Sequence, residues 1–156
     1  MTARQRDSGA YLVTRNALNP VTVTAGTTAD GQERNGAIID RLAFNDLILS
    51  VKVALPYNMA LSTADTGTVA ANLQDSPSTA STAFADYADK DGSTGVSVVT
   101  TTAGPLGSIL EFDVDLSSAR RYVRVQVTPT MSSTATDTID LAGVLVFGGS
   151  DNIPPT

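Results

Sequence analysis

The sequence predicts a single all-β domain, an antiparallel β-sandwich of jelly-roll type, and three observations lead to this prediction. Hydrophobic residues recur with a period of two along most of the 156-residue chain, as expected for strands with one buried face. Dipeptides typical of tight turns, such as Asp30-Gly31, Asn35-Gly36, Asp91-Gly92 and Gly148-Gly149, separate these stretches. No window of eleven or more residues keeps helical spacing, and Leu116–Arg120 is the best candidate for a single helical turn.

Three stretches alternate clearly, and a fourth is apolar on both faces. In Leu49–Leu55, Leu110–Leu116 and Arg121–Val127, every second residue is hydrophobic, so one face is buried. Arg124 and Gln126 are expected on the outer face of the stretch Arg121–Val127. Asp140–Phe147 has no polar face after its first residue, which predicts a central strand. Weaker strands are expected at Val21–Ala25, Ala37–Phe44, Val69–Gln74, Ala83–Tyr87 and Val96–Thr102, which makes about nine strands in all.

The two ends of the chain differ from the middle. Residues 1–20 are polar and read as an extended N-terminal arm, residues 21–149 as the β-sandwich domain, and residues 150–156 as a short C-terminal tail. Deletion of residues 1–18 is therefore expected to leave the domain folded.

Charge argues against nucleic acid as a partner, and the hydropathy of the sequence argues against a membrane. The formal net charge is −6, and residues after position 41 carry five basic against twelve acidic side chains, so a phosphate backbone would be repelled. The basic residues Arg4, Arg6 and Arg15 near the start are suited to an acidic surface. No stretch approaches the roughly 20 apolar residues of a membrane span, and the first residues lack the apolar core of a secretory signal. Neither nucleic acid nor membrane is an expected partner.

The sequence offers little for catalysis. It contains no histidine and no cysteine, which excludes imidazole-based triads and His or Cys metal sites. Glu111, Asp113 and Asp115 share one strand face, but an acidic outer face that meets Arg120, Arg121 or Arg124 explains them as well as an acid pair does. Lys52 is expected to be a solvated charge. The chain is therefore predicted not to be an enzyme and to need no cofactor.

Two kinds of ligand stay open as weaker alternatives. Asp86, Asp89 and Asp91 suggest calcium, although their spacing does not fit an EF-hand loop and a hairpin turn explains them. A sugar-binding module normally displays aromatic platforms, whereas tryptophan is absent and the four tyrosines are scattered.

From about residue 19 onward the chain resembles a family of small structural proteins of tailed bacteriophages. The order and spacing of several stretches carry the resemblance, and no single motif is specific. These stretches are Asn35–Arg41, Ala71–Ser76, Phe112–Leu116, Arg120–Pro129, Asp137-Thr138 and Leu145–Gly149.

The resemblance implies a virion component made in the host cytoplasm, a capsid decoration or cement protein that stabilises contacts between capsomers on the outer capsid surface. Its partners would be the major capsid protein and further copies of itself, as a trimer or dimer. The interface is expected to use the arm and the outer faces of edge strands, namely Arg4, Arg6, Tyr11, Arg15, Arg120, Arg121 and Arg124. A tail or baseplate module and a host-surface glycan-binding module are the alternatives.

Overall fold

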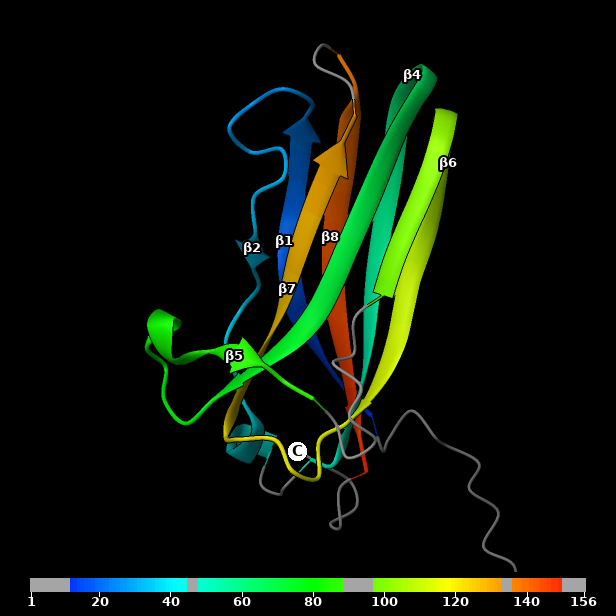
Figure 1. Cartoon of the computed structure of the whole chain (residues 1–156). Coiled ribbons are helices and arrows are strands. Elements are labelled where there is room, and N and C mark those ends of the chain that lie inside the picture. Colours follow the sequence, from blue (N-terminus) through cyan, green and yellow to red (C-terminus); the bar gives the residue numbers. More distant parts are fainter. Residues whose placement is uncertain (1–11, 45–47, 89–96, 133–135, 150–156) are drawn as a thin grey trace, which may run out of the picture.

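The computed structural model describes residues 12–44, 48–88, 97–132 and 136–149, which form a two-layered β structure (Figure 1). Eight strands of this part of the chain belong to one antiparallel sheet. They are β1 (Val13–Thr24), β2 (Arg34–Asn35), β3 (Ile39–Asp40), β4 (Ser50–Ser76), β5 (Ala85–Asp86), β6 (Ser97–Asp115), β7 (Tyr122–Met131) and β8 (Thr138–Gly148). Two short 3-10 helices, η2 (Arg41–Phe44) and η3 (Ser81–Ala83), complete it, and neither is long enough to cross a membrane.

The long strands β4 and β6 form a ribbon that folds over on itself, and this fold creates the two layers. Their pairing runs from Ser50 opposite Asp115 to Leu61 opposite Gly104, shifts, and resumes with Thr66 opposite Thr102. Ala64 and Gly104 have positive φ angles of 72° and 84° at the bend, where ordinary strand geometry stops. Figure 1 shows β4 turning over at its upper end. Each of the two strands therefore contributes one half to each layer.

The remaining strands extend the two halves of the ribbon. In the back layer, residues 50–60 of β4 pair with β8, and β8 pairs with β1. In the front layer, residues 67–76 of β4 pair with β7, whose other edge pairs with β2 and β3. The strand order β1-β8-β4-β7-β2 thus runs through both layers. This arrangement confirms the predicted antiparallel β-sandwich of jelly-roll type.

The core lies between the layers and follows the period-two pattern. Val123, Val125 and Val127 of β7 are fully buried, as their alternation predicts. On β8, Leu145 and Phe147 are fully buried while Val144 remains 38% exposed, so this strand is central and apolar on both faces as expected. Each buried Val, Leu or Phe side chain contributes about 1.5–3 kcal/mol relative to exposure, so the alternating strands supply most of the stability.

Several element boundaries differ from the sequence-based prediction. Residues 13–20, assigned above to the arm, belong to β1 and pair with β8, whereas residues 1–11 lie outside the described part. Ala17 and Leu18 are buried, so the structure leads us to expect that deletion of residues 1–18 removes part of the core and is not neutral. The stretches 49–55 and 69–74 belong to one strand, β4. Residues 116–120 form a turn closed by a hydrogen bond from the amide of Ala119 to the carbonyl of Leu116, and not a helical turn.

The segment from residue 35 to residue 44 also departs from expectation. Asn35-Gly36 makes no tight turn, because Asn35 lies in β2 opposite Gln126. Gly36 instead lets this segment approach β1, where the amide of Ala37 donates to the carbonyl of Ala17 at 2.8 Å. A Cβ at Gly36 would lie 2.2 Å from that carbonyl oxygen. Only residues 39–40 of the expected strand at 37–44 are extended, and η2 follows them.

Candidate interaction surface

The outer surface of the back layer carries exposed hydrophobic side chains where an antiparallel sheet usually shows polar ones. The register places Ile109 of β6 opposite Pro56 of β4, and Ala54 of β4 opposite Val144 of β8. Ile109 is 56% exposed and Val144 is 38% exposed. We call this surface the outer apolar face, and it consists of Ala54, Pro56, Ile109, Ala142, Val144 and Val146.

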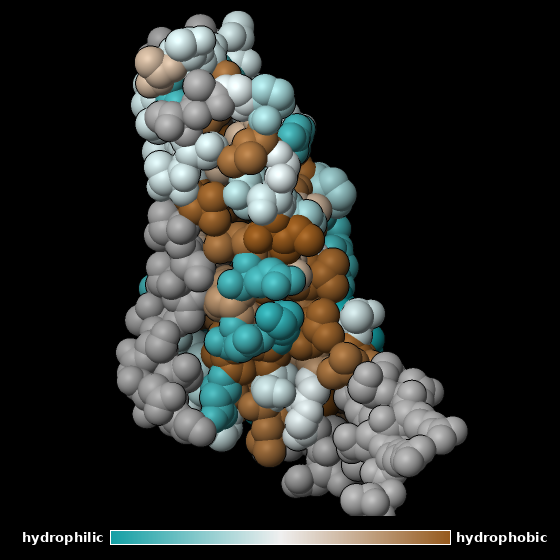
Figure 2. Space-filling model, turned by 90° about the vertical axis from the view of Figure 1, so that its right-hand side faces the viewer, coloured by the Kyte–Doolittle hydropathy of each residue, from teal (hydrophilic) through white to brown (hydrophobic). Residues whose placement is uncertain are grey.

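Figure 2 views the molecule from the side on which β6 lies and shows hydrophobic surface over much of that side, with hydrophilic groups set into it. Leu106 of β6 is 39% exposed but pairs with the buried Met59, so its side chain lies on the inner side of the strand, opposite to Ile109. Exposed hydrophobic surface of this kind is common where proteins contact other macromolecules, which makes this face the candidate interaction surface.

A hollow of about 440 Å³ opens in the outer apolar face, and two prolines account for it. Pro56 has no amide hydrogen, and the pairing of β4 with β8 is interrupted between Ala54 and Tyr57. The pairing of β1 with β8 shifts between Leu18 and Val21, at Pro20. Both interruptions lie beside the hollow, whose prolines, Val21 and Ala142 can contact a hydrophobic side chain of a partner.

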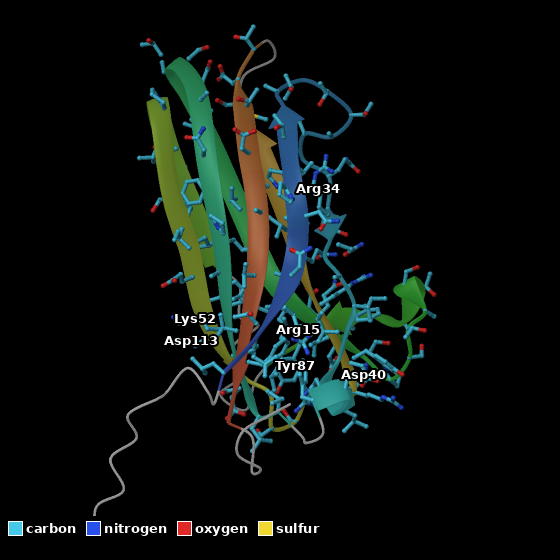
Figure 3. The ribbon with its side chains drawn as sticks, turned by 180° about the vertical axis from the view of Figure 1, so that it is seen from behind. Arg15, Arg34, Asp40, Lys52, Tyr87 and Asp113 are labelled. Carbon is cyan, nitrogen blue, oxygen red and sulfur yellow. The ribbon has the colours of Figure 1, made fainter. Side chains whose placement is uncertain are left out.

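An exposed ion-pair cluster borders the same face. The ammonium group of Lys52 lies 3.2 Å from a carboxylate oxygen of Asp113 and 3.7 Å from one of Glu111. Figure 3 shows Lys52 and Asp113 next to each other. The two acids therefore meet Lys52 of the neighbouring strand, and not the arginines named as their partners in the sequence analysis. All three side chains are exposed to solvent, which favours surface contact over acid–base catalysis.

Of the predicted interface residues that the structure describes, Arg15, Arg120 and Arg121 are exposed and Arg124 is buried. Arg4, Arg6 and Tyr11 lie outside the described part of the chain. Arg15 is exposed on β1, and its guanidinium carbon lies 4.7 Å from the centre of the Phe44 ring. Arg120 is exposed beyond the end of the front layer, where its backbone amide donates to Asp75 at 2.8 Å.

Arg121 forms a two-point ion pair with Asp40 at the same end of the molecule. Its Nε and Nη2 atoms donate to the two carboxylate oxygens at 3.0 and 2.7 Å. The hydrogen bond from Arg121 lowers the pKa of the Asp40 carboxyl group below its ordinary value. This pair ties β3 to the start of β7 and leaves both residues accessible.

Arg124 is enclosed by its own chain, because the segment from residue 77 to residue 87 covers the outer surface of the front layer. Its Nε donates to Gln74 at 2.9 Å, and its guanidinium carbon lies 4.2 Å from the centre of the Phe84 ring. Asp86 accepts hydrogen bonds from Asn72 and Gln74 and holds the covering segment in place. Arg124 is only 6% exposed, so it supports the fold and does not reach a partner in this structure.

The residues that the sequence analysis missed are those of the outer apolar face. The available signal was the hydrophobic second face of Asp140–Phe147, which was interpreted only as evidence for a central strand. Asp86, one of the acids considered for calcium, is bound by amide groups, and Asp89 and Asp91 lie outside the described part. Within the described ranges no three His, Cys, Asp or Glu side chains converge on a potential metal position.

Comparisons with known proteins find similarity at the level of the fold. No family model matches the chain, and no curated protein matches it. A chain in the structure of the Gx strain of infectious bursal disease virus matches 92% of this chain with 12% sequence identity and a TM-score of 0.50. The match covers 34% of the viral chain, so this protein spans about a third of its length.

Two further solved structures are less similar. A chain of the VP2 subviral particle of infectious bursal disease virus is 10% identical over 89% of this chain and 32% of its own, with a TM-score of 0.44. The capsid protein of BFDV is 12% identical over 88% of this chain and 99% of its own, with a TM-score of 0.31. The similarity to the chain of the Gx strain supports a jelly-roll β fold, and at this identity it extends to the fold alone.

Proposed function

We propose that the protein is a non-enzymatic structural component of a virion, and specifically a decoration or cement protein bound to the outer surface of a capsid. The observation that carries the proposal is the outer apolar face on a jelly roll similar to that of a virus particle. The absence of histidine and cysteine from the sequence agrees with a structural role. The resemblance to small structural proteins of tailed bacteriophages supports the same location.

The outer apolar face would contact the major capsid protein. Burial of Ile109 and Val144 removes hydrophobic surface from water, and the hollow beside Pro56 takes up a side chain of the capsid. The exposed charges of Lys52, Glu111 and Asp113 at the border orient the contact. Self-association into a trimer or dimer would add avidity, because several faces then bind the same lattice together.

Residues 1–11 would form a second contact. They carry Arg4 and Arg6, and after Leu12 the chain enters β1 at Val13. Val13 pairs with Phe147, so the described parts next to the two termini lie at the same end of the sandwich. A basic segment at this end is suited to an acidic region of a capsid exterior.

Co-sedimentation with capsids stripped of this protein tests the proposal. Wild-type protein is expected to bind saturably, and Ile109→Lys and Val144→Lys are expected to weaken binding by about tenfold or more, because each places an unpaired charge in the contact. Leu42→Lys is the matched control, since Leu42 is 52% exposed on η2, away from the outer apolar face. Equal binding by all three variants would refute the proposed contact face. Absence of binding together with assembly of the protein into rings or tubes would place it in the tail.

A further inference from the structure

Strand β6 forms one side edge of both layers, and no other strand of the described part of the chain lies along that edge. Over its whole length β6 pairs with β4 alone. Figure 1 shows β6 at the right-hand side of the sandwich, first in the front layer and, after the bend, in the back layer. The opposite side is closed, because the amide of Ala37 beside β2 donates to the carbonyl of Ala17 on β1 at 2.8 Å. Within the described ranges, the outward backbone groups of β6 are therefore open to a further strand.

The half of β6 in the back layer is protected against pairing with another strand. Proteins protect edge strands with charged side chains, prolines and backbone irregularities. Gly104, with a φ angle of 84°, and Pro105 interrupt regular strand geometry at the bend. Further along, Glu111 and Asp113 place exposed negative charges on the strand. A second strand would meet all of these obstacles here.

The half of β6 in the front layer lacks this protection, and we call its residues 97–103 the open edge. They read Ser-Val-Val-Thr-Thr-Thr-Ala, without a charge, a proline or a glycine. Most of them are β-branched, which favours the extended conformation. Thr100 is exposed and pairs with Thr68, whose neighbour Val69 is fully buried, so Thr100 belongs to the outer side of the layer. An uncharged run of this kind on a free sheet edge is a template for strand pairing.

The sequence of the open edge is suited to pair with a second copy of itself. In an antiparallel pair with a two-fold axis at Thr100, this residue faces Thr100 of the second copy, and Val99 faces Thr101. No charges are then opposed, and pairs of β-branched residues across two strands are favourable. The axis lies next to the bend, so the two copies extend from it in opposite directions. Glu111 and Asp113 of one copy are thereby kept away from those of the other.

We propose that two copies of the protein pair through their open edges and form one continuous antiparallel sheet across a two-fold axis. The axis is perpendicular to the front layer, and rotation about it leaves the outer side of each layer facing the same way. The outer apolar faces of both copies therefore point to the same side of the dimer and can contact one surface together. This inference specifies the surface and the symmetry of the self-association proposed above, and only its use on a capsid rests on that proposal.

Sedimentation equilibrium of the purified full chain measures the pairing without any capsid. The wild type is expected to form a dimer in a concentration-dependent manner. Thr100→Lys is expected to weaken dimerisation by at least about tenfold, because it places two like charges directly opposite each other at the axis. Thr130→Lys is the matched control and is expected to dimerise like the wild type. Thr130 is also exposed and also pairs with Thr68, but it lies on β7, on the side of β4 away from the open edge.

A disulfide tests the register of the pairing. The chain has no cysteine, so a single introduced cysteine can form a disulfide only between two copies. Opposite residues of antiparallel strands have Cα atoms about 4.5–5.5 Å apart, within the roughly 4.4–6.8 Å that a disulfide spans. Thr100→Cys is expected to give a covalent dimer on mild oxidation, seen on a non-reducing gel. Thr130→Cys is expected to stay a single chain on the same gel.

Three results would overturn the proposal: a monomeric or trimeric wild type, equal dimerisation of Thr100→Lys and Thr130→Lys, and equal cross-linking of the two cysteine variants. Thermal midpoints from circular dichroism show whether each variant is folded. If Thr100→Lys does not fold, Thr100→Glu takes its place with the same expectation, because it also opposes like charges at the axis. Neither assay contains a capsid. A failure of the pairing therefore leaves the capsid contact of the outer apolar face standing, and a failure of capsid binding leaves the pairing standing.

Discussion

Replacement of Arg41 by methionine is expected to cause the largest loss of stability of any single arginine substitution in the described part of the chain. Arg41 is 1% exposed and begins η2 at one end of the sandwich. Its Nη2 donates to the carbonyls of Ile48 and Leu116 at 2.6 and 2.7 Å, and its Nη1 donates to those of Ala119 and Arg120. A single guanidinium group thus joins η2, Ile48 and the turn at residues 116–120.

The magnitude follows from these hydrogen bonds. Hydrogen bonds to charged groups contribute about 1.5–3 kcal/mol each, and a buried carbonyl left without a partner costs about 1–3 kcal/mol. Methionine recovers part of this loss because burial of the cation itself is costly, and that burial lowers the pKa of Arg41. We expect a net loss of roughly 3–5 kcal/mol, which is a large share of the roughly 5–15 kcal/mol that stabilises a domain.

Urea unfolding followed by circular dichroism measures this loss. The urea midpoint of Arg41→Met is expected to fall strongly, while the slope of the free energy of unfolding against urea concentration stays the same. The midpoint of Arg41→Lys is expected to lie between those of Arg41→Met and the wild type. Arg121→Met removes an exposed arginine and serves as the control, with a much smaller change expected. An Arg41→Met protein as stable as the control would show that the carbonyls find other partners, and would refute this account of the end of the sandwich.

Three further predictions concern single features of the fold. Asp40→Asn is expected to reduce the loss of stability that acid causes below about pH 4. The pKa of Asp40 is lower in the folded than in the unfolded protein, so its ionised form stabilises the fold above the unfolded-state pKa, and this contribution disappears as the pH falls through the folded-state pKa. Urea midpoints between pH 2 and 7 measure the effect, and the same decrease of the midpoint in acid for variant and wild type would contradict it. Gly36→Ala is expected to cost roughly 1–3 kcal/mol because its Cβ would collide with the carbonyl of Ala17, whereas Gly107→Ala, whose nearest neighbour would lie 3.6 Å away, is expected to be nearly neutral in the same unfolding assay. Deletion of residues 1–11 is expected to leave the thermal midpoint unchanged, while deletion of residues 1–18 is expected to lower it because buried Ala17 and Leu18 are lost; equal midpoints would show that β1 before residue 19 adds nothing to stability.

The sequence predicts the fold class well because burial of one face imposes a period of two. Val123, Val125 and Val127 alternate in the sequence and are fully buried in the structure. The same pattern cannot show that residues 49–55 and 69–74 belong to one strand, because the bend at Ala64 depends on pairing with β6. It also predicts an exposed Arg124, because the segment that covers it comes from a distant part of the sequence.

The candidate sites are less predictable than the fold. Arg41 follows Asp40 and has no local signal for burial, and only the meeting of residues 48 and 116–120 around it explains its burial. The register shifts of β1 likewise have no signal in the local sequence. By contrast, Val144 and Val146 were visible as a second hydrophobic face of one strand. Their interpretation required the structure, because exposure depends on whether another layer covers them.

Electron cryo-microscopy of capsids with and without the bound protein tests the central claim most directly. The account predicts additional density on the capsid exterior into which the sandwich fits with Ile109 and Val144 against the major capsid protein. This density is expected to be absent from capsids incubated with Ile109→Lys and present with Leu42→Lys. Density that places the outer apolar face toward solvent, or no density on the head at all, would contradict the account.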